Sequence, residues 1–316
     1  MVLELEHFVT LFDSLFLPQG LALHRSMLRE LNNFTLWILC VDRMAYDVLE
    51  GLELPHVRIL DLAELETNEL VKVKPTRSKG EYCWTLTPHA PKFVFDAAPE
   101  VGRVTYLDAD LWFRSDTQPV FAEFGQSNKS VLITDHLYSA EHDHSNMNGR
   151  FCVQFMTFRR DAGEDVRAWW QDRCIEWCFS KFEDGKFGDQ KYLDDWPKRF
   201  SNQVHVLSDR YPVIGPWNSM RFPYSSAFAF HFHGVRVISK NRIAIADNYD
   251  IPEVTFRNVY QKYFADLKDA MQTLGEAGYV VRSQSAMPPR YLSMLSRLRR
   301  LFWVFRVKLR RSVYSI

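Results

Sequence analysis

The sequence lacks a long apolar run, a signal of export and a cysteine pattern typical of a metal or disulfide site. No uncharged apolar run approaches the roughly 20 residues that a membrane-spanning helix needs, and 301–305, for example, is flanked by arginine. The opening MVLELEHFVTLF carries Glu4 and Glu6 where a secretory signal would have positive charge. We therefore expect no export signal and a cytoplasmic protein.

The five cysteines are scattered and odd in number, which is typical of a reducing compartment and not of a disulfide framework. Cys174 and Cys178 have helical spacing, but no nearby cysteine or histidine completes a zinc site. We expect them to pack inside the protein.

Neither sign of charge is in excess overall, because 39 Lys and Arg balance 39 Asp and Glu. The balance is uneven along the chain: nine of these 39 basic residues follow Glu276, the last acidic residue, which leaves 30 basic against 39 acidic residues before it. An acidic body of this kind argues against a nucleic-acid partner.

Short β-branched or aromatic runs alternate with helical stretches in the first hundred residues, a pattern typical of an α/β fold with a mostly parallel sheet. Strands are expected at 7–12, 35–41, 57–62, 103–107, 131–134, 152–158 and 228–232. Helices are expected at 21–31, 92–97, 162–179 and 189–196. Two prolines near 288 separate a main domain, 1–282, from a basic tail, 283–316.

Two carboxylates follow the buried strand 103–107 in the segment VTYLDADLWF. Asp108 and Asp110 stand at i and i+2 at the carboxyl end of a strand, where ligands bind in open α/β sheets. Paired carboxylates there suit one Mg²⁺ or Mn²⁺ ion that neutralises a leaving diphosphate. The alternative is that the pair caps the strand or begins a turn.

Several separated segments resemble the A-type glycosyltransferases, and within them family 8, the retaining galactosyl- and glucosyltransferases that include lipopolysaccharide enzymes. The segment FVTLFDSLFLPQGLALHRSML resembles the family's first strand, donor-base loop and helix. The resemblance implies that Thr10 and Asp13 contact the nucleotide base. It also identifies YLDAD as the family's metal motif, with Asp110 as a direct ligand and Asp108 reaching metal and ribose.

Two later segments extend the resemblance. FGDQKYLDDW resembles the family's Gly-Asp-Gln segment, which implies that Asp189 binds donor-sugar hydroxyls and Gln190 lies near the anomeric carbon. Asp189 after glycine is equally suited to cap a helix. HFHG resembles the family's late histidine motif, which implies that His231 is the third metal ligand; His233 shares its strand face and stays an alternative. Imidazole with carboxylates suits Mn²⁺.

The chain departs from the family pattern at two places. Val237 stands where the family has a phosphate-binding lysine, with Lys240 and Arg242 as candidate substitutes. The family's Asn-x-Gly near the donor sugar is replaced by Cys152-Val153-Gln154, so Gln154 is the expected sugar contact unless Asn148-Gly149 serves instead.

Two further segments have open roles. Arg77 and Lys79, just before a helical stretch, either bring positive charge to the nucleotide phosphates or lie in a solvated loop. The loop with His136, His142 and His144 has no regular ligand spacing, so we expect a flexible loop, with an acceptor-side lid or a second metal site as alternatives.

The basic tail has the spacing of an amphipathic helix. Its apolar positions are Tyr291, Met294, Leu295, Leu298, Leu301, Phe302, Phe305 and Leu309, and Arg297, Arg300, Lys308 and Arg311 fall opposite them. Such a helix can lie on an anionic membrane surface, which would place the protein at the inner face of the membrane. The alternative is that the helix packs on the acidic body.

These features predict an enzyme: a hexosyltransferase with Mn²⁺ or Mg²⁺ that moves a hexose from a UDP-sugar to a saccharide or glycolipid acceptor, with retention, in cell-surface glycan or lipopolysaccharide synthesis. One rival is a haloacid-type phosphatase with Asp108 as nucleophile, although Leu111-Trp112 follows where a small residue is expected. Another is a non-catalytic nucleotide-sugar or membrane-binding protein, against which the presence of Asp108, Asp110 and His231 argues.

Overall fold

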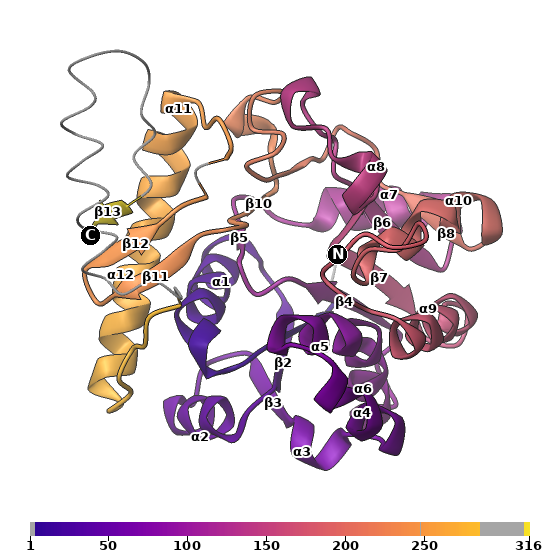
Figure 1. The fold of residues 1–316 in the computed structure, drawn as a ribbon, viewed down its shortest axis with the longest axis horizontal. Helices are drawn as coiled ribbons and strands as arrows, with labels where there is room; N and C mark the ends of the chain where they lie inside the picture. Colours follow the sequence, from indigo (N-terminus) through magenta and orange to yellow (C-terminus); the bar gives the residue numbers. More distant parts are fainter. Residues whose placement is uncertain (1–3, 247, 285–312) are drawn as a thin grey trace.

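The structure, a computed structural model, describes residues 4–246, 248–284 and 313–316 (Figure 1). Its centre is a seven-stranded sheet with the strand order β3-β2-β1-β4-β7-β6-β8. These strands are β1 (Glu6–Phe12), β2 (Phe34–Cys40), β3 (Val57–Asp61), β4 (Arg103–Leu107), β6 (Val131–Asp135), β7 (Phe151–Arg159) and β8 (Val204–Val206). The neighbours from β3 to β4 are parallel, β7 runs antiparallel to β4 and β6, and β8 is parallel to β6. The predicted α/β fold with a mostly parallel sheet is confirmed.

Helices cover both faces of this sheet (Figure 1). The α-helices are α1 (Leu17–Glu30), α2 (Arg43–Leu52), α3 (Leu62–Leu65), α4 (Asn68–Val73), α5 (Lys79–Leu86), α6 (Ala90–Ala97), α7 (Gln118–Ser127), α8 (Ser145–Asn148), α9 (Glu164–Glu176), α10 (Trp196–Arg199), α11 (Glu253–Thr255) and α12 (Gln261–Glu276). Shorter helical turns are η1 (Ser14–Phe16), η2 (Lys74–Thr76), η3 (Thr87–His89), η4 (Ala140–His142), η5 (Gln190–Asp195), η6 (Tyr224–Ser226) and η7 (Phe256–Tyr260). Local sequence sets several of their starts: Ser78 and Glu81 form a capping box at α5, and Asp42 caps α2.

The two faces of the sheet bury separate apolar clusters because side chains alternate along each strand. On β1, Phe8 and Phe12 pack into one cluster with α1, whereas Val9 and Leu11 pack into the other with α6. Thr10 points to the same side as Phe8 and is fully buried. The central strands are therefore rigid supports for whatever follows their carboxyl ends.

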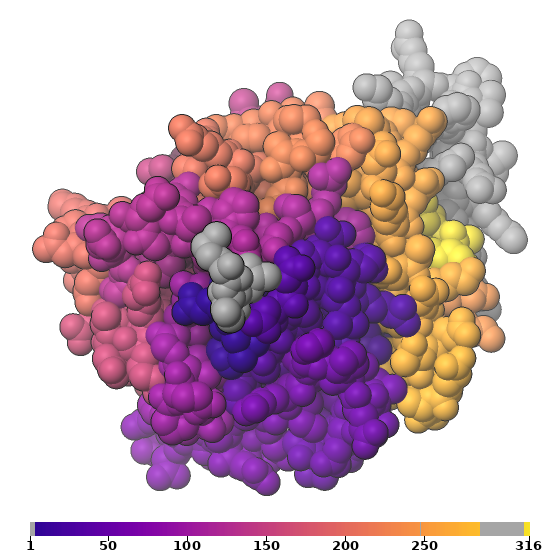
Figure 2. Space-filling model, turned by 180° about the vertical axis from the view of Figure 1, so that it is seen from behind, coloured from indigo at the N-terminus to yellow at the C-terminus, as the bar shows by residue number. Residues whose placement is uncertain are grey.

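Two smaller sheets complete the molecule. β5 (Leu111–Phe113), β9 (Val213–Ile214) and β10 (Ala229–His231) form one, and β11 (Arg236–Ser239), β12 (Arg242–Ala244) and β13 (Val313–Ser315) form the other. α12 lies beside α1, as Figures 1 and 2 show from opposite sides. Asp266 of α12 accepts two hydrogen bonds from Arg29, at 3.0 and 2.6 Å, and one from the Trp112 indole at 2.6 Å, so it joins α12 to α1 and β5.

Most expected elements are found within a few residues of their predicted bounds, with two corrections. The expected helix 189–196 is the 3₁₀ turn η5, followed by the short α10, whose first turn contains Pro197. The expected helix 162–179 ends at Glu176, before a β-region residue at Trp177.

Most of the predicted amphipathic tail helix, with Tyr291 to Leu309, lies outside the described residues and stays a prediction. The last residues, Val313–Ser315, pair antiparallel with β12. No helix within the described part of the chain is both long and apolar enough to cross a membrane.

Candidate functional site

The acidic pair is positioned by the junction between the large sheet and a small one. Asp108 follows β4, and its backbone N–H donates to the Gln154 carbonyl at 3.1 Å. Asp110 precedes β5, which pairs antiparallel with β10 so that Leu111 lies opposite His231. The backbone N–H of Phe232 donates to the Asp110 carbonyl at 2.9 Å. Backbone pairing alone therefore brings His231 to the acidic pair across more than a hundred residues of sequence.

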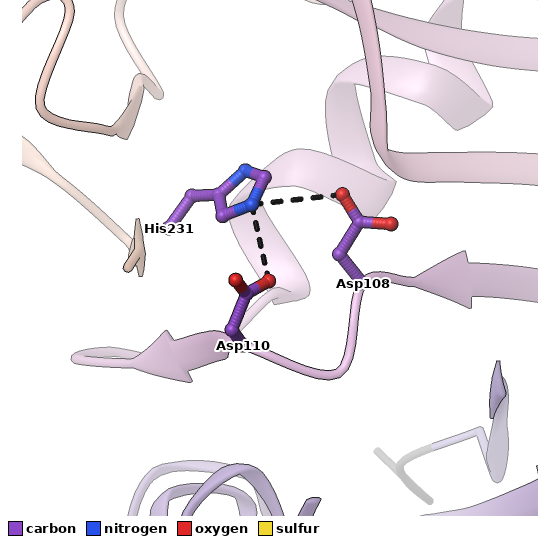
Figure 3. A group of neighbouring side chains, drawn as sticks. All are labelled: Asp108, Asp110 and His231. Atoms are coloured by element: carbon purple, nitrogen blue, oxygen red, sulfur yellow. Dashed lines mark ion pairs between the residues drawn. The ribbon is translucent and has the colours of Figure 1, made fainter. Parts of the chain in front are cut away.

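The three side chains point toward one another (Figure 3). His231 Nε2 lies 3.1 Å from Asp110 Oδ1 and 3.7 Å from Asp108 Oδ2. The other imidazole nitrogen, Nδ1, lies 2.8 Å from Gln154 Oε1. Because an amide oxygen only accepts, this contact assigns the proton to Nδ1 and turns Nε2 toward the carboxylates. Of the two candidate histidines, His231 joins the carboxylates, while the ring of His233 lies 6.0 Å from it.

Burial and mutual charge set the protonation of this cluster. Burial by itself would lower the pKa of His231, but Asp110 and Asp108 hold that pKa well above its usual value. Burial would raise the pKa of Asp110, yet the charge and hydrogen bond of His231 bring it to about 2. The pKa of Asp108 is raised to about 6, by burial with a contribution from Asp110 and against the opposing charge of His231. Without a cation, two close carboxylates are thus balanced by an imidazolium.

A divalent cation fits these residues. One ligand atom from each of Asp108, Asp110 and His231 lies within 4.8 Å of the others. Among the described residues, these three side chains form the group that could hold a metal ion. Two carboxylate oxygens with one imidazole nitrogen form a donor set that Mn²⁺ accepts. The hydrogen bond from Nδ1 to Gln154 is the outer contact that metal-binding histidines commonly make. The cation would replace the imidazolium proton, since metal binding requires neutral histidine.

Asp189 lies deep beside this cluster. It is 2% exposed, and its backbone carbonyl accepts a hydrogen bond from the Trp170 indole at 2.8 Å. Burial and the neighbouring charge of Asp108 raise the pKa of Asp189 to about 8. Asp189 occupies the N-cap position of η5 without a side-chain capping hydrogen bond there. Tyr106 links the two acids, because its hydroxyl donates to Asp108 Oδ1 at 3.0 Å and its pKa is raised by burial and by both carboxylates.

Gln190 joins Asp189 to the loop that precedes β7. Its side-chain amide donates to the Asn148 carbonyl at 2.7 Å, and the neighbouring Lys191 donates to the Ser145 carbonyl at 2.9 Å.

The histidine loop is also held from its other side: the carbonyl of His136 accepts from the Trp217 indole at 2.9 Å and from the Asn218 amide at 2.8 Å. His136 and His142 of the loop that was expected to be flexible are buried.

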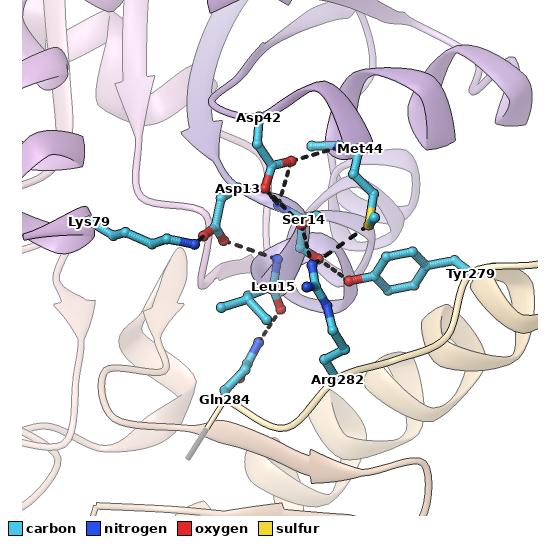
Figure 4. Close-up of polar contacts among 10 residues, drawn as sticks. Asp13, Ser14, Leu15, Asp42, Met44, Lys79, Tyr279, Arg282 and Gln284 are labelled. Atoms are coloured by element: carbon cyan, nitrogen blue, oxygen red, sulfur yellow. Dashed lines mark hydrogen bonds and ion pairs between the residues drawn. The ribbon is translucent and has the colours of Figure 1, made fainter. Parts of the chain in front are cut away.

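The predicted base loop after β1 is a second polar region (Figure 4). Asp13 caps η1 by accepting from the Leu15 N–H at 3.0 Å, and burial, opposed by this bond, raises its pKa. Asp42 accepts from the Ser14 hydroxyl at 2.8 Å. Lys79, which is 84% exposed, brings its ammonium to 4.0 Å from Asp13.

The C-terminal part of the chain closes over the same loop (Figure 4). The Tyr279 hydroxyl donates to the Ser14 carbonyl at 2.5 Å, and Arg282 donates to the Ser14 hydroxyl at 2.9 Å. Gln284 donates to the Leu15 carbonyl at 2.5 Å and accepts from the Val237 N–H at 2.7 Å. We call these three side chains, Tyr279, Arg282 and Gln284, the C-terminal clasp. No motif in the sequence predicts it.

The two predicted phosphate-binding cations separate. Lys79 stays beside Asp13, whereas Arg77 lies away from it, donating to the Ile175 carbonyl at 3.2 Å with its guanidinium 3.9 Å from the centre of the Phe179 ring. Arg236 is a further cation near the site, and it was not predicted from the sequence. Its charge lowers the pKa of Asp110, after the larger effects of burial and His231, and its guanidinium lies 5.4 Å from the centre of the Phe16 ring. Arg236 directly precedes Val237, which stands at the position of the family's phosphate-binding lysine. This adjacency could have identified Arg236 from the sequence. Lys240 and Arg242 flank the β11–β12 turn.

Some of the buried polar atoms without a hydrogen-bond partner lie on predicted site residues. Among the described residues they include Thr10 Oγ1, Gln154 Nε2 and Asp189 Oδ2. Such atoms are rare in native proteins and are typical of sites completed by a ligand or water. Gln154 is fully buried beneath His231, a positioning contact that the sequence did not indicate; its predicted contact with the sugar stays a prediction.

Comparison with known proteins places the chain in a family. No family model matches it. The uncharacterized protein YfnF of Bacillus subtilis is 33% identical over 279 residues, which cover 82% of this chain and 91% of YfnF. The chain belongs to the YfnF family. The uncharacterized protein YfnD of the same organism is also similar, with 29% identity over 279 residues that cover 83% of this chain and 88% of YfnD.

Solved structures resemble this chain in fold. The glycosyltransferase GlyE of Streptococcus pneumoniae matches with a TM-score of 0.52 and 15% identity, over 89% of this chain and 66% of GlyE. The bifunctional glycosyltransferase WbbM matches with a TM-score of 0.52 and 15% identity, over 87% of this chain and 52% of WbbM. The fold is therefore a glycosyltransferase fold. At this identity the likeness concerns the fold, and the chemistry must be argued from the site.

Proposed function

We propose that the protein is a metal-dependent glycosyltransferase that moves a hexose from a UDP-sugar to a saccharide or lipid-linked acceptor. The observation that carries the proposal is the cluster of Asp108, Asp110 and His231 at the carboxyl end of β4. In this fold the sheet edge is where a nucleotide ligand is expected. The family 8 resemblance, the donor UDP and Mn²⁺ as the preferred ion all belong to this proposal.

Mn²⁺ or Mg²⁺, held by Asp108, Asp110 and His231, would neutralise the charge that develops on the departing diphosphate. Gln154 keeps His231 Nε2 turned toward the site, so the ligand geometry is formed in advance. Arg236, whose charge lowers the pKa of Asp110, supplies the phosphate contact that Val237 cannot make. Thr10, Asp13 and the rest of the base loop bind the nucleoside, with Lys79 at the edge.

Asp189 and Gln190 serve the donor sugar in this proposal. The raised pKa of Asp189 favours a protonated carboxyl, which donates hydrogen bonds to sugar hydroxyls and accepts hydrogen bonds from them. Gln190, fixed through Asn148, offers its amide oxygen near the anomeric carbon. Transfer with retention follows from the family resemblance.

The acceptor belongs to cell-surface glycan or lipopolysaccharide synthesis in this proposal, and the basic tail, 283–316, would bring the catalytic domain, 1–282, to the anionic inner face of the membrane. Binding of the full chain to anionic vesicles, but not to neutral ones, tests the tail. Equal binding of a chain that ends at residue 284 would contradict it.

The proposal is tested by UDP release from a panel of UDP-sugars by the purified protein. We expect release with Mn²⁺, none with EDTA, and none for Asp110→Ala, while Asp172→Ala, an exposed aspartate on α9, matches the wild type. Metal-dependent release of inorganic phosphate from phosphomonoesters, without UDP release, would favour a haloacid-type phosphatase. Binding of UDP-sugars without turnover would favour a non-catalytic protein.

A further inference from the structure

A cavity of about 480 Å³ lies at the same edge of the large sheet as Asp108, Asp110 and His231, the candidate metal ligands that we call the metal cluster. β4, β6 and β8 run in one direction, because β7 is antiparallel to both β4 and β6 while β8 is parallel to β6. Asp135 ends β6, and Leu207 and Asp209 follow β8, so the cavity residues lie at the carboxyl ends of these strands. Two strand spacings, about 10 Å, separate β4 from β6.

Two series of side-chain contacts connect this cavity with His231 and with Gln190. Ring to ring, Tyr138 in the cavity stacks on His136 at 4.6 Å, His136 meets Trp217 at 5.2 Å, and Trp217 meets His231 at 5.2 Å. On the other side, Gln190 is bonded to Asn148 in the loop that carries Ser145 and Arg150, both of which line the cavity. The cavity wall is therefore continuous with the residues around the metal cluster and with Gln190.

The lining is amphipathic and slightly acidic. Asp135, Asp143 and Asp209 supply acceptors, Arg150 and Arg221 supply donors, and Leu137, Tyr138, Val206 and Leu207 supply apolar surface. Sugars match such a lining, since their hydroxyls need both donors and acceptors and their C–H faces pack on aromatic or aliphatic groups. The volume falls within the range of small-molecule sites, roughly 300–1,000 Å³.

Other ligands fit less well. Three carboxylates against two guanidinium groups leave the lining unfavourable for a phosphate group. Two of the carboxylates are already engaged: Asp135 accepts from Arg150 Nε at 2.6 Å and from the Leu137 N–H at 2.7 Å, and Asp143 caps Ser145 at 2.9 Å. Within the described residues, the group of three side chains that could hold a metal ion is Asp108, Asp110 and His231. None of the cavity aspartates belongs to it, so the cavity is less suited to a metal ion.

We infer that this cavity is the acceptor site and that it binds a neutral saccharide. The inference rests on the proposed glycosyltransferase function and adds to it the place and chemistry of the second substrate. Asp209 and Arg221, both exposed, are the side chains to test, because their removal leaves the buried cluster and the sheet intact.

The experiment measures binding of the full chain to an array of immobilised neutral, acidic and amino saccharides, with UDP release from the UDP-sugar panel as a parallel readout. We expect the wild type to bind neutral saccharides, and Asp209→Ala and Arg221→Ala to bind them at least tenfold more weakly. Both variants should keep acceptor-independent UDP release and the circular dichroism of the wild type. Asp172→Ala is the matched control.

The outcomes separate the two proposals. Unchanged array binding by both cavity variants, binding only to acidic saccharides, or no array binding by a wild type that releases UDP would each overturn the acceptor site while leaving the transferase intact. Array binding that depends on Asp209 and Arg221, together with no UDP release from any donor, would instead overturn the transferase and leave a saccharide-binding cavity.

Discussion

The metal cluster and the base loop differ in how they are held together. Asp108, Asp110 and His231 are placed by backbone pairing of β4, β5 and β10, and their side chains contact one another in a largely buried setting. The base loop around Asp13 and Ser14 is instead held by side chains from elsewhere, namely Asp42, Lys79 and the C-terminal clasp. The cluster is therefore expected to be rigid, whereas the loop depends on the end of the main domain.

This difference predicts separable effects. Substitutions in the cluster should abolish metal binding and turnover, whereas substitutions in the clasp should weaken nucleotide binding and spare metal binding. Asp110→Ala, Gln154→Leu and Gln284→Ala test this division, and Asp189→Asn tests the electrostatics beside the cluster; the largest expected effect comes first.

Asp110→Ala removes the carboxylate that lies closest to His231. We expect metal-dependent turnover to fall roughly a thousandfold, because the loss of stabilisation for the leaving diphosphate amounts to several kcal/mol. UDP release at saturating Mn²⁺ measures the effect. Turnover within tenfold of the wild type would place the metal, or the chemistry, elsewhere.

Asp189→Asn should change how stability depends on pH. The pKa of Asp189 is about 8 in the folded protein and 3.8 ordinarily, so between these values the folded state binds the extra proton and stability falls as pH rises. Between pH 5 and pH 7.5 this loss amounts to roughly 3 kcal/mol at 1.36 kcal/mol per pH unit, and asparagine, which carries no ionisable proton, abolishes it. Urea unfolding in EDTA at both pH values measures the difference.

A parallel pH dependence in wild type and Asp189→Asn would contradict the raised pKa. Below pH 3.8 and above pH 8 the two proteins should show the same slope, because there Asp189 has the same protonation in the folded and unfolded states.

Gln154→Leu removes the acceptor for His231 Nδ1 and puts an apolar side chain of similar size in its place. We expect Mn²⁺ affinity to fall about 10- to 100-fold, the usual effect of losing an outer contact of a metal-binding histidine. Titration followed by electron paramagnetic resonance measures bound and free Mn²⁺ directly. Gln126→Leu, on exposed α7 surface, is the control, and equal affinity in both variants would remove Gln154 from this role.

Gln284→Ala should have the smallest effect and a different character. It loses the hydrogen bonds to the Leu15 carbonyl, the Val237 N–H and the Gln19 side-chain amide, each worth about 1 kcal/mol. We expect UDP to bind about fivefold more weakly while Mn²⁺ affinity stays unchanged. Calorimetry on this variant and on Gln272→Ala, an exposed control on α12, separates the two affinities. A matching loss of Mn²⁺ affinity would show that the two regions are not independent.

The same contrast explains what could be predicted from the sequence. The acidic pair is local, since two carboxylates directly follow an apolar strand, and HFHG ends another strand; both signals lie within a few residues. The fold class followed from the alternation of strands and helices. Strand bounds agreed closely because β1, β2 and β4 are apolar runs with clear ends.

The remainder depends on contacts between distant segments. The clasp joins residues 14–15 to 279–284, and its Tyr, Arg and Gln have no spacing that indicates a partner. Gln154 was expected to face the sugar, but its depth beneath His231 follows from the pairing of β4 with β7. Arg77 and Lys79, two residues apart, diverge because Arg77 lies before the cap of α5 and packs against the end of α9. Proximity in sequence did not place these cations together.

We propose that Asp108, Asp110 and His231 hold the metal that serves a bound nucleotide diphosphate. Anomalous diffraction at the manganese edge, from crystals containing Mn²⁺ and UDP, locates the ion. We predict one strong peak within bonding distance of all three side chains and of the UDP phosphates. A manganese peak at other residues, or UDP bound with no peak between these three side chains, would contradict the account.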